Sequence, residues 1–541
     1  MEQAPNMKDY RKEYAEFSWH VPERFSFPLD VFDRWAEDKN NTAILWTDGA
    51  VEKMFSFNEL KVLSSKGADA FKKMGIQKGD KVLVMLPNIP EWWEIMLALM
   101  RLNAIPIPAT TILTSKDIEY RLSATDIKAV ISMEEDAQKV EEAVNNSSSK
   151  PLLIIVGKRE GMLDYIAERD NADALEGERA LSHEPALIYF TSGTTGPPKM
   201  VLHTQASYPL AHFVTGKYWL DLRPGDIHWN LSDTGWAKAA WSSLFGPWHM
   251  GATIFSFHKK GRFEPSSIMD ILRKYPVTTL CGPPTAYRMM AKEIPAEEFH
   301  FKAMRHFVAA GEPLNREIIE IWKERTGRYI YDGYGQTETV NILANFRCLG
   351  VKSGSMGMPV PGFTVDIIDE DGNLLPPDTE GDIAIKIKPE RPVGLFREYS
   401  GNPHATEKTM RGQWYITGDR AYKDEDGYFW FVGRADDVIL TSGYRIGPFE
   451  IESILIKHPA VKESAVVASP DEVRGEVVKA FIVLTQDYRP SDALIKELQE
   501  FVKKNTAPYK YPRKIEFVED LPKTISGKIK RKELKMREFG R

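Results

Sequence analysis

One feature constrains the fold of this chain most: short, wholly apolar runs alternate with longer amphipathic ones. Lys81–Leu86, Ala129–Ser132 and Leu152–Val156 have the length and composition of buried strands. Between the first two runs, Pro90–Leu102 has the period of a helix with proline in its first turn. Apolar strands that are separated by helices belong to parallel sheets covered by helices, so we expect an α/β fold.

The C-terminal part of the chain has a pattern of its own. Three apolar runs have strand character: Lys462–Val467, Val477–Leu484 and Lys514–Val518. Ser491 can cap a helix whose apolar residues recur at helical spacing. Turn residues and charges at 433–437 separate this part from the body. Because 541 residues exceed what one core usually supports, we expect an N-terminal domain at 1–434 and a C-terminal α+β domain at 435–541.

The composition excludes several classes of protein. The chain has 71 basic and 77 acidic residues and a formal net charge of −6, so no basic excess favours nucleic acid as a partner. Cys281 and Cys348 are too few for a disulfide framework, which suits a reducing compartment. The apolar stretch Trp92–Ala109 contains Glu94 and Arg101, so it reads as a buried helix and strand and not as a membrane span.

The N-terminal residues indicate where the protein works. They are polar and charged, without the apolar core of a signal peptide. We therefore expect a soluble, cytoplasmic protein that binds no nucleic acid and does not insert stably into a membrane. A location in the mitochondrial matrix would follow if a presequence had been removed. The sequence pattern gives no prediction for the oligomeric state.

The stretch YFTSGTTGPPK at residues 189–199 has the composition of an anion-binding loop. Gly193 and Gly196 let backbone N–H groups converge on an anion. Hydroxyl donors are supplied by Thr191, Ser192, Thr194 and Thr195. The loop is not a Walker A motif, because that motif has four residues between its glycines and a Ser or Thr after the lysine, whereas Met200 follows Lys199 here. Taken alone, such a loop is as often a polar hairpin turn.

This loop resembles the phosphate-binding loop of adenylate-forming enzymes, which comprise acyl-CoA synthetases, amino-acid adenylation domains and luciferases. Five further motifs follow in that family's order: AAGEP at 309–313, YDGYGQTE at 331–338, WYITGDR at 414–420, GRADDV at 433–438 and LPKTISGKIKR at 521–531. The set extends over residues 60–535 and is highly specific. The resemblance implies a large N-terminal domain of stacked α/β sheets with a β-rich subdomain, and a small, mobile C-terminal α+β domain.

The resemblance also implies how the chain holds ATP. Tyr334 would stack on adenine and Asp332 would accept from its amino group. Asp419 would bind both ribose hydroxyls. Thr337 would donate to the α-phosphate and Glu338 would hold Mg²⁺, a hard cation that prefers oxygen. The full set expected to bind ATP or AMP is Thr191, Ser192, Gly193, Thr194, Thr195, Gly196, Lys199, Gly311, Glu312, Pro313, Asp332, Gly333, Tyr334, Gly335, Gln336, Thr337, Asp419 and Arg434.

The final motif carries the residue that resembles the family's catalytic lysine, Lys528. Its ammonium would bridge the substrate carboxylate and the α-phosphate as negative charge develops there. Thr337 and Glu338 complete the catalytic set. The other basic residues, at 530–532, are expected to be solvated surface. Asp436 resembles the hinge about which the small domain turns between two half-reactions.

A second set of residues is similar to the CoA-binding residues of medium-chain acyl-CoA synthetases. The segment 441–447 resembles the lining of their pantetheine tunnel, with Gly443 leaving room for a thin chain. The expected CoA-binding residues are Ser442, Gly443, Tyr444, Arg445, Arg474, Lys503 and Tyr511. Any single Lys or Arg among them could instead be ordinary surface charge.

The resemblance also bears on the acid. Acetyl-CoA synthetases carry a tryptophan where this chain has Gly335, and we expect its absence to open the acyl pocket, with Trp236 as one wall. Each buried CH₂ stabilises a bound chain by about 0.8 kcal/mol, which favours a longer acid. We expect a medium-chain or branched fatty acid. A benzoate-type aryl acid is the alternative, and an amino acid is a weaker one.

Together these motifs predict an ATP-dependent, AMP-forming acyl-CoA synthetase in fatty acid metabolism. A carboxylic acid and ATP would form an acyl-adenylate with Mg²⁺, and CoA would take the acyl group after the small domain has rotated. A non-enzymatic nucleotide-binding descendant should have lost Lys528, Glu338 or Asp419, and all three are present.

Overall fold

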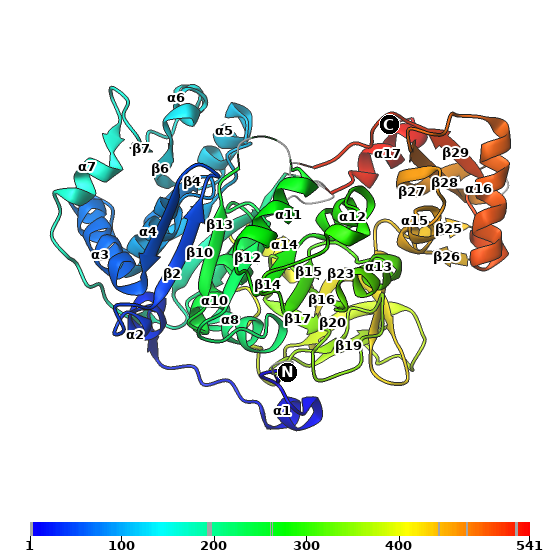
Figure 1. The fold of residues 1–541 in the computed structure, drawn as a ribbon, viewed down its shortest axis with the longest axis horizontal. Coiled ribbons are helices and arrows are strands. Elements are labelled where there is room, and N and C mark those ends of the chain that lie inside the picture. Colours follow the sequence, from blue (N-terminus) through cyan, green and yellow to red (C-terminus); the bar gives the residue numbers. More distant parts are fainter. Residues whose placement is uncertain are drawn as a thin grey trace.

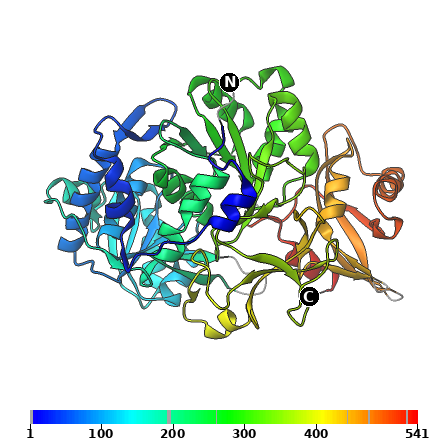
Figure 2. The ribbon, with the colours of Figure 1, turned by 90° about the horizontal axis from the view of Figure 1, so that it is seen from below.

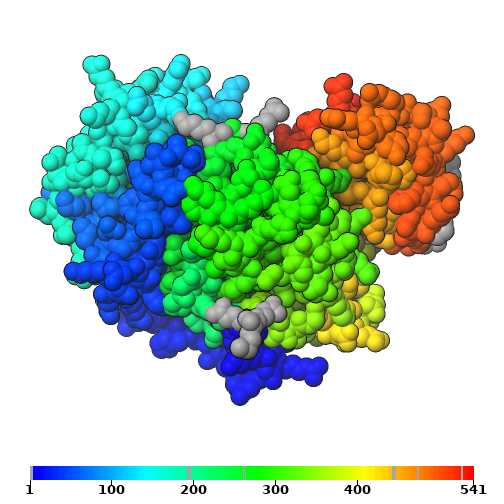
Figure 3. All heavy atoms as spheres, in the orientation of Figure 1, coloured from blue at the N-terminus to red at the C-terminus, as the bar shows by residue number. Residues whose placement is uncertain are grey.

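The protein folds into a large body and a smaller C-terminal lobe beside it (Figure 1; Figure 3). The structure is a computed structural model. It describes residues 4–191, 197–259, 261, 263–441, 444–471, 474–524 and 528–540. The body corresponds to the expected stacked α/β sheets with a β-rich subdomain, and the lobe to the expected small α+β unit, so the predicted fold class is confirmed.

The largest sheet runs through the centre of the body (Figure 1). Its strands, in spatial order, are β18 (Met358–Pro359), β17 (Asn341–Ala344), β16 (Ile330–Gly335), β15 (His306–Ala310), β14 (Thr279–Gly282), β12 (Ile227–Asn230), β13 (Thr253–Phe257), β2 (Thr42–Thr47) and β3 (Glu52–Ser56). From β16 to β2 all neighbours are parallel. One face packs on α11 (Pro265–Lys274), α12 (Pro284–Glu293) and α13 (Arg316–Thr326).

A second sheet is parallel throughout, as its apolar strands predicted. Its order is β5 (Ile105–Pro108), β4 (Lys81–Met85), β6 (Ile127–Met133), β7 (Leu152–Val156) and β8 (Leu163–Asp164). The helices around it are α3 (Phe57–Lys73), α4 (Pro90–Arg101), α5 (Ser115–Ala124), α6 (Ala137–Asn146) and α7 (Tyr165–Asp170). The expected strands and helix of this region are therefore confirmed, the observed ends differing by a few residues.

A small antiparallel sheet carries the expected phosphate loop. It consists of β10 (Pro185–Thr191), β11 (Lys199–Thr204) and β21 (Glu398–Tyr399). Thr191 pairs directly with Lys199, so the loop connects two paired residues. Ile188 and Phe190 of β10 pack with residues of the second sheet in one apolar cluster, which anchors the loop to the body.

The β-rich subdomain consists of β19 (Val365–Ile368), β20 (Gly381–Lys386), β23 (Trp414–Lys423), β22 (Met410–Arg411) and β24 (Phe429–Arg434). A tight turn joins β23 to β24, with Gly427 N–H donating to Asp424 O at 2.9 Å. The turn places Asp419 opposite Arg434 in the ladder. The domain boundary predicted after residue 434 lies between this sheet and the next strand, and it remains a prediction.

The C-terminal lobe has its own sheet, β26 (Tyr444–Ile446), β25 (Ile439–Thr441), β28 (Gly475–Leu484), β27 (Val461–Asp471) and β29 (Lys514–Phe517). Its helices are α15 (Pro448–Leu455), α16 (Asp492–Asn505) and α17 (Arg531–Glu538). Ser491 caps α16 as predicted, its hydroxyl accepting from Leu494 N–H at 3.2 Å. The lobe touches the body where Asn315 Nδ2 donates to Ser453 Oγ at 2.7 Å.

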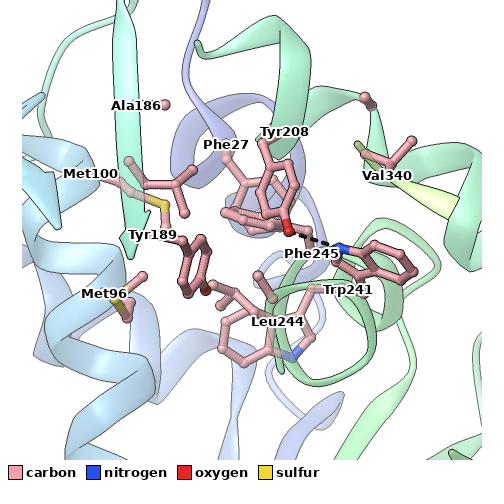
Figure 4. Close-up of a cluster of buried hydrophobic side chains, with 14 of the residues drawn as sticks. Phe27, Met96, Met100, Ala186, Tyr189, Tyr208, Trp241, Leu244, Phe245 and Val340 are labelled. Atoms are coloured by element: carbon pink, nitrogen blue, oxygen red, sulfur yellow. Dashed lines mark hydrogen bonds between the residues drawn. The ribbon is translucent and has the colours of Figure 1, made fainter. Parts of the chain in front are cut away.

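Large aromatic side chains fill the space between the sheets. Figure 4 shows Tyr189, Tyr208, Trp241 and Phe245 meeting around aliphatic side chains, with the indole N–H of Trp241 donating to Tyr208 Oη at 2.7 Å. All four are buried. This aromatic cluster lies directly behind the cavity described below.

The N-terminal segment lies across the body ahead of the first sheet strand (Figure 2). Its helix α1 (Tyr10–Glu16) is held by side chains: Tyr10 Oη donates to Pro359 O at 2.9 Å, and Tyr14 Oη donates to Phe363 O at 2.8 Å. Asn6 adds bonds from its side chain to Lys217 O at 3.0 Å and Leu222 O at 2.9 Å.

Candidate active site

A cavity of about 1770 Å³ opens where the body, the β-rich subdomain and the C-terminal lobe meet. Asp332 from the large sheet, Asp419 from the β-rich subdomain and Lys528 from the lobe all line it. The carboxyl ends of parallel strands, which form one wall, are where α/β folds bind their ligands. The structure thus brings together residues from most of the motifs singled out in the sequence.

A hydrogen-bonded network is built around the carboxylate of Asp419. Tyr334 Oη donates to Oδ2 at 2.6 Å, and Gln336 Nε2 donates to the same oxygen at 2.8 Å. Arg434 Nε lies 3.2 Å from Oδ1. Asp419 is 4% exposed. A buried carboxylate with this many partners is held in one orientation, ready to accept from hydroxyls of a ligand.

The strand ends beside this network are shaped by glycines. Gly333 lies so close to the ring of Trp219 that a Cβ would fall 2.4 Å from Cε2. Gly311 has φ +98°, which favours glycine. Between them Asp332 is buried, and burial raises the pKa of its carboxyl well above the usual value. Bare backbone next to a buried acceptor suits a flat, polar ring such as a nucleobase.

Two neighbours of Gly311 are also at the cavity wall. Glu312 accepts from Thr285 Oγ1 at 2.7 Å, and Arg288 lies 3.5 Å from the same carboxylate oxygen. Pro313 lines the cavity beside it. The AAGEP turn therefore presents its backbone to the cavity, while its one charged side chain is already paired.

Thr337 and Glu338 follow β16 and face the phosphate-loop sheet. Glu338 Oε1 accepts from Tyr399 Oη at 2.7 Å, and its carbonyl accepts from Phe396 N–H at 2.7 Å. The Lys199 ammonium lies 4.7 Å from the centre of the Tyr399 ring. Thr191 and Lys199 line the cavity, whereas the loop residues Ser192, Gly193, Thr194, Thr195 and Gly196 lie outside the described residues.

If Mg²⁺ binds at this site, few of its ligands come from protein side chains. Among the described residues, no group of three or more His, Cys, Asp or Glu side chains could hold a metal ion. Mg²⁺ is commonly held by one or two carboxylates, waters and substrate phosphates and not by a protein cage. A single carboxylate, Glu338, beside a phosphate loop fits that pattern.

Lys528 reaches the cavity from the loop before α17. Its backbone is fixed by a pair of bonds, from its N–H to Thr524 Oγ1 at 3.0 Å and from Thr524 N–H to its carbonyl at 2.7 Å. A second lysine that the sequence did not single out, Lys238, donates to Ala310 O at 2.8 Å. Burial, and to a lesser extent the charge of Lys528, lower the pKa of Lys238.

Arg531 corrects one expectation from the sequence. It was expected to be solvated surface, but it pairs with the buried Glu452, Nε donating to Oε1 at 3.0 Å and Nη2 to Oε2 at 2.6 Å. Glu452 is 5% exposed and also accepts from Val466 N–H at 2.8 Å. A buried carboxylate requires a cation, and α17 supplies it. Lys530, by contrast, is exposed as expected.

The two expected acyl-pocket residues, Trp236 and Gly335, both line the cavity, as does Trp241. A Cβ on Gly335 would lie 2.4 Å from Val340 O and 2.6 Å from Cη2 of Trp241. The Trp241 ring therefore packs close beside Gly335. An open acyl channel at Gly335 remains a prediction.

Only three of the seven expected CoA residues have side chains that the structure describes, so CoA binding by this set remains a prediction. Ser442 and Gly443 lie outside the described residues, and Tyr444 and Arg445 are described only as backbone of β26. Of the remaining three, Arg474, Lys503 and Tyr511, none is among the described residues that line the cavity. Lys503 instead lies over the Tyr511 ring, with its ammonium 4.3 Å from the ring centre.

Asp436 lies in the short connection between β24 and β25. This connection is pinned at both ends, Ala435 N–H donating to Gly418 O at 3.0 Å and Asp437 N–H donating to Arg434 O at 3.0 Å. Asp436 also lines the cavity. A hinge role for Asp436 remains a prediction.

Comparisons with known proteins define the class of protein. Residues 32–399 match the family model described as AMP-binding enzyme, and residues 450–528 match the AMP-binding enzyme C-terminal domain. The chain belongs to the AMP-binding enzyme family, as the motifs indicated.

Two relatives show which members of this family the chain is similar to. The chain is 50% identical to acyl-coenzyme A synthetase ACSM3, mitochondrial, of Mus musculus, covering 99% of this chain and 94% of that one. It is 48% identical to ACSM4, mitochondrial, of Homo sapiens, covering 96% and 91%.

Solved structures with similar folds come from the same class. A Brucella canis acyl-CoA synthetase is 32% identical, with a TM-score of 0.75 and 99% of both chains covered. The anthranilate CoA ligase AuaEII, in complex with anthranoyl-AMP, is 29% identical, with a TM-score of 0.87 and coverage of 96% and 98%.

Within the described ranges, no helix is both long enough and apolar enough to cross a bilayer.

Proposed function

We propose that this chain is an AMP-forming acyl-CoA synthetase that converts a carboxylic acid, ATP and CoA into an acyl-CoA, AMP and pyrophosphate. The observation that carries the proposal is one cavity shared by three groups: the Asp419 network, the Thr337–Glu338 segment and Lys528. Relatives named acyl-coenzyme A synthetases at about half identity over nearly the full chain support it.

In the first half-reaction, an oxygen of the substrate carboxylate attacks the α-phosphorus of ATP. The new bond is carboxyl oxygen to phosphorus, and the bond to the β-phosphate oxygen breaks, releasing pyrophosphate. Lys528 lies in the cavity as a cation that can neutralise charge on both the carboxylate and the α-phosphate. Asp419 and Tyr334 would hold the nucleoside in place, so that positioning lowers the barrier.

Mg²⁺ would be held by Glu338 and would neutralise charge on the departing phosphates. Tyr399 keeps one oxygen of that carboxylate occupied, and Glu338 lines the cavity. Lys199 and the phosphate loop would bind the β- and γ-phosphates that leave together.

In the second half-reaction, the CoA thiolate attacks the acyl carbon and AMP leaves. Arg474, Lys503 and Tyr511, the expected CoA residues whose side chains the structure describes, are not among the residues that line the cavity, while Lys528 is. This arrangement fits the first half-reaction. We infer that the lobe rotates about Asp436 before thioester formation, which moves Lys528 out and brings 441–447 in.

For the acid, we propose a medium-chain or branched fatty acid, with aryl acids as the second candidate. The wall formed by Trp236 and Trp241 is aromatic and apolar, which suits an aliphatic chain. The similar structures of a benzoate CoA ligase and an anthranilate CoA ligase favour the aryl alternative. An amino acid is a weaker candidate, because its amine would usually require a carboxylate in the pocket. The 232–236 pocket segment offers only one, that of Asp233.

The relatives' names also bear on the location. The ACSM relatives are named mitochondrial, which supports the mitochondrial matrix, the second of the two locations expected from the sequence.

The decisive test is pyrophosphate release with ATP and Mg²⁺ across acids from acetate to laurate, with benzoate and glycine, with and without CoA. We expect acyl-CoA formation to peak at an intermediate chain length. Pyrophosphate release from none of these acids would overturn the proposal, and release from glycine alone would move the chain to the amino-acid adenylating class.

Trp241→Ala tests the acyl pocket. Removing the ring that lies against Gly335 should let longer acids enter, with a gain of about 0.8 kcal/mol for each extra buried CH₂. The measurement is kcat/KM across the acid series for the variant and the parent. An unchanged optimum would show that the chain runs elsewhere in the cavity.

A further inference from the structure

Two side chains from neighbouring strands hold the Thr337–Glu338 segment. His203 on β11 places Nε2 2.7 Å from Thr337 O, and Tyr399 on β21 donates to Glu338 Oε1 at 2.7 Å. These strands are hydrogen-bonded neighbours, Val201 pairing with Tyr399. The same sheet carries the phosphate loop, so a single rigid unit contacts both parts of the triphosphate site.

The His203 bond has a defined direction. A carbonyl oxygen only accepts, so Nε2 carries the proton and donates to Thr337 O. Nδ1 is then the acceptor, 3.2 Å from the Ser207 hydroxyl, which in turn accepts from Thr204 N–H at 2.8 Å. The ring is fully buried and packs against the Tyr208 ring, with the ring centres 4.0 Å apart and the planes tilted by 35°. Its tautomer and its orientation are therefore both fixed.

Tyr399 links two charged groups. Its ring, which is 5% exposed, has the Lys199 ammonium over one face and the Glu338 carboxylate at its hydroxyl. Lys199 begins β11, immediately after the phosphate loop. The backbone repeats this linkage, because Phe396 N–H donates to Glu338 O and Arg397 N–H donates to Leu202 O at 2.8 Å.

We propose that His203 and Tyr399 are positioning residues for adenylate formation. They fix the Thr337 backbone and the Glu338 carboxylate relative to the phosphate loop before ATP binds. Neither is expected to touch the reacting atoms. The inference rests on the proposed function, and it goes beyond it by assigning roles to two residues on a separate sheet.

The proposal predicts that only one half-reaction depends on these residues. Adenylate formation places the triphosphate between the loop and Glu338, so a misplaced carboxylate slows it. Thioester formation starts after pyrophosphate has left, so it does not use this arrangement. A purely structural role would affect both half-reactions alike.

Tyr399→Phe in the full-length enzyme is the first test, because it keeps the ring and removes only the hydroxyl. Pyrophosphate release from ATP and octanoate should fall about 10- to 100-fold, the range for a lost bond to a charged group. CoA thioester formation from synthetic octanoyl-adenylate should change less than about twofold. The matched control is Tyr428→Phe, which removes a buried hydroxyl bond to Gly350 O elsewhere.

His203 is tested by a rescue pair. His203→Leu removes the donor and should slow adenylate formation, whereas His203→Gln retains an N–H near the position of Nε2 and should restore most of the rate. His249→Leu is the control, because His249 Nε2 also bonds a backbone carbonyl, Pro209 O at 2.7 Å, away from the site. Equal losses in the Leu and Gln variants, or in both half-reactions, would overturn the proposal.

Binding gives a readout that is independent of turnover. Mn²⁺ with α,β-methylene-ATP, which cannot release pyrophosphate, serves as the probe in equilibrium dialysis. Tyr399→Phe should weaken Mn²⁺ binding in the ternary complex several-fold while leaving metal-free binding of the nucleotide analogue unchanged. If the wild-type enzyme released pyrophosphate with no acid, the proposed function would fail, and this measurement would still decide the positioning role. Unaltered Mn²⁺ binding in the variant would contradict that role.

Discussion

The expected nucleotide residues and the expected CoA residues are arranged in opposite ways. The described members of the nucleotide set converge on one cavity, and some of their side chains already bond one another, as Tyr334 and Gln336 bond Asp419. Of the CoA set, the described members Arg474, Lys503 and Tyr511 lie off that cavity, and Lys503 and Tyr511 contact each other. Under the proposed function, the placement of the lobe in this structure assembles the nucleotide half-site, and the CoA half-site would require another placement.

The nucleotide residues and the CoA residues differ in how much their arrangement depends on the lobe. Asp419 sits on a rigid ladder opposite Arg434, so its network costs little to maintain without ligand. Lys528 belongs to the lobe and lines the cavity, so under the proposed function it would complete the nucleotide site only while the lobe is docked. The two half-sites therefore share the lobe, and mutations should separate them.

The largest expected effect concerns the anchor of the lobe's catalytic loop. Arg531→Met would leave Glu452 buried and unpaired, and should destabilise the lobe by about 3–5 kcal/mol. Urea or thermal unfolding of the full chain measures this change. Lys530→Met, at an exposed neighbour, should change stability by less than about 0.5 kcal/mol. Equal stabilities of the two variants would show that the buried pair does not hold α17.

Lys528→Ala should produce the largest difference in rate loss between the two half-reactions. Losing the cation that faces the α-phosphate should slow pyrophosphate release by about 10²- to 10³-fold. Thioester formation from synthetic acyl-adenylate should be nearly unchanged, since Lys528 would leave the cavity in that step. Parallel loss of both activities would argue against a rotating lobe.

Asp419→Asn should weaken the nucleotide half-site alone. The substitution keeps the shape but removes the charge that Arg434 faces, and we expect the KM for ATP to rise about 10- to 100-fold. The KM for CoA should stay the same. Asp426→Asn in the nearby exposed turn is the control. A matching rise with Asp426→Asn would mean that the fold of the subdomain, and not the site, had been altered.

Lys503→Met should produce the smallest effect, and this effect should fall on the CoA half-site. A single exposed charge contact to the CoA phosphates contributes about 1 kcal/mol, so the KM for CoA should rise about fivefold. Pyrophosphate release without CoA should not change. Lys504→Met serves as the neighbouring control. An equal rise in the KM for CoA in that variant would show that the effect comes from general surface charge and not from a specific contact.

The sequence predicted the local structure well where short-range chemistry decides it. The run Leu152–Val156 is β7 with the same bounds, and Ser491 caps α16. The motifs also contain residues that line the cavity, among them Asp332, Asp419 and Lys528, because each motif carries its own turn or strand end. These features depend on neighbours within a few positions.

Long-range pairing limited the rest. Arg531 reads as part of a charge run because Glu452, its partner, is 79 residues away. Tyr399 lies 61 residues from Glu338, and no local pattern marks it. The ring that packs close beside Gly335, that of Trp241, comes from a different element. Such contacts are set by how the sheets stack, which periodicity does not specify.

The N-terminal segment has a practical consequence. Tyr10 and Tyr14 bond carbonyls beside the β-rich subdomain, and Asn6 bonds Lys217 O and Leu222 O, on either side of Trp219, the residue that backs Gly333. Shortening the chain to begin at the first sheet strand would remove this fastening from the far side of the nucleotide wall. Variants that are trimmed or tagged at this end should therefore keep every residue from Ala4 onward, since this segment is part of the folded body.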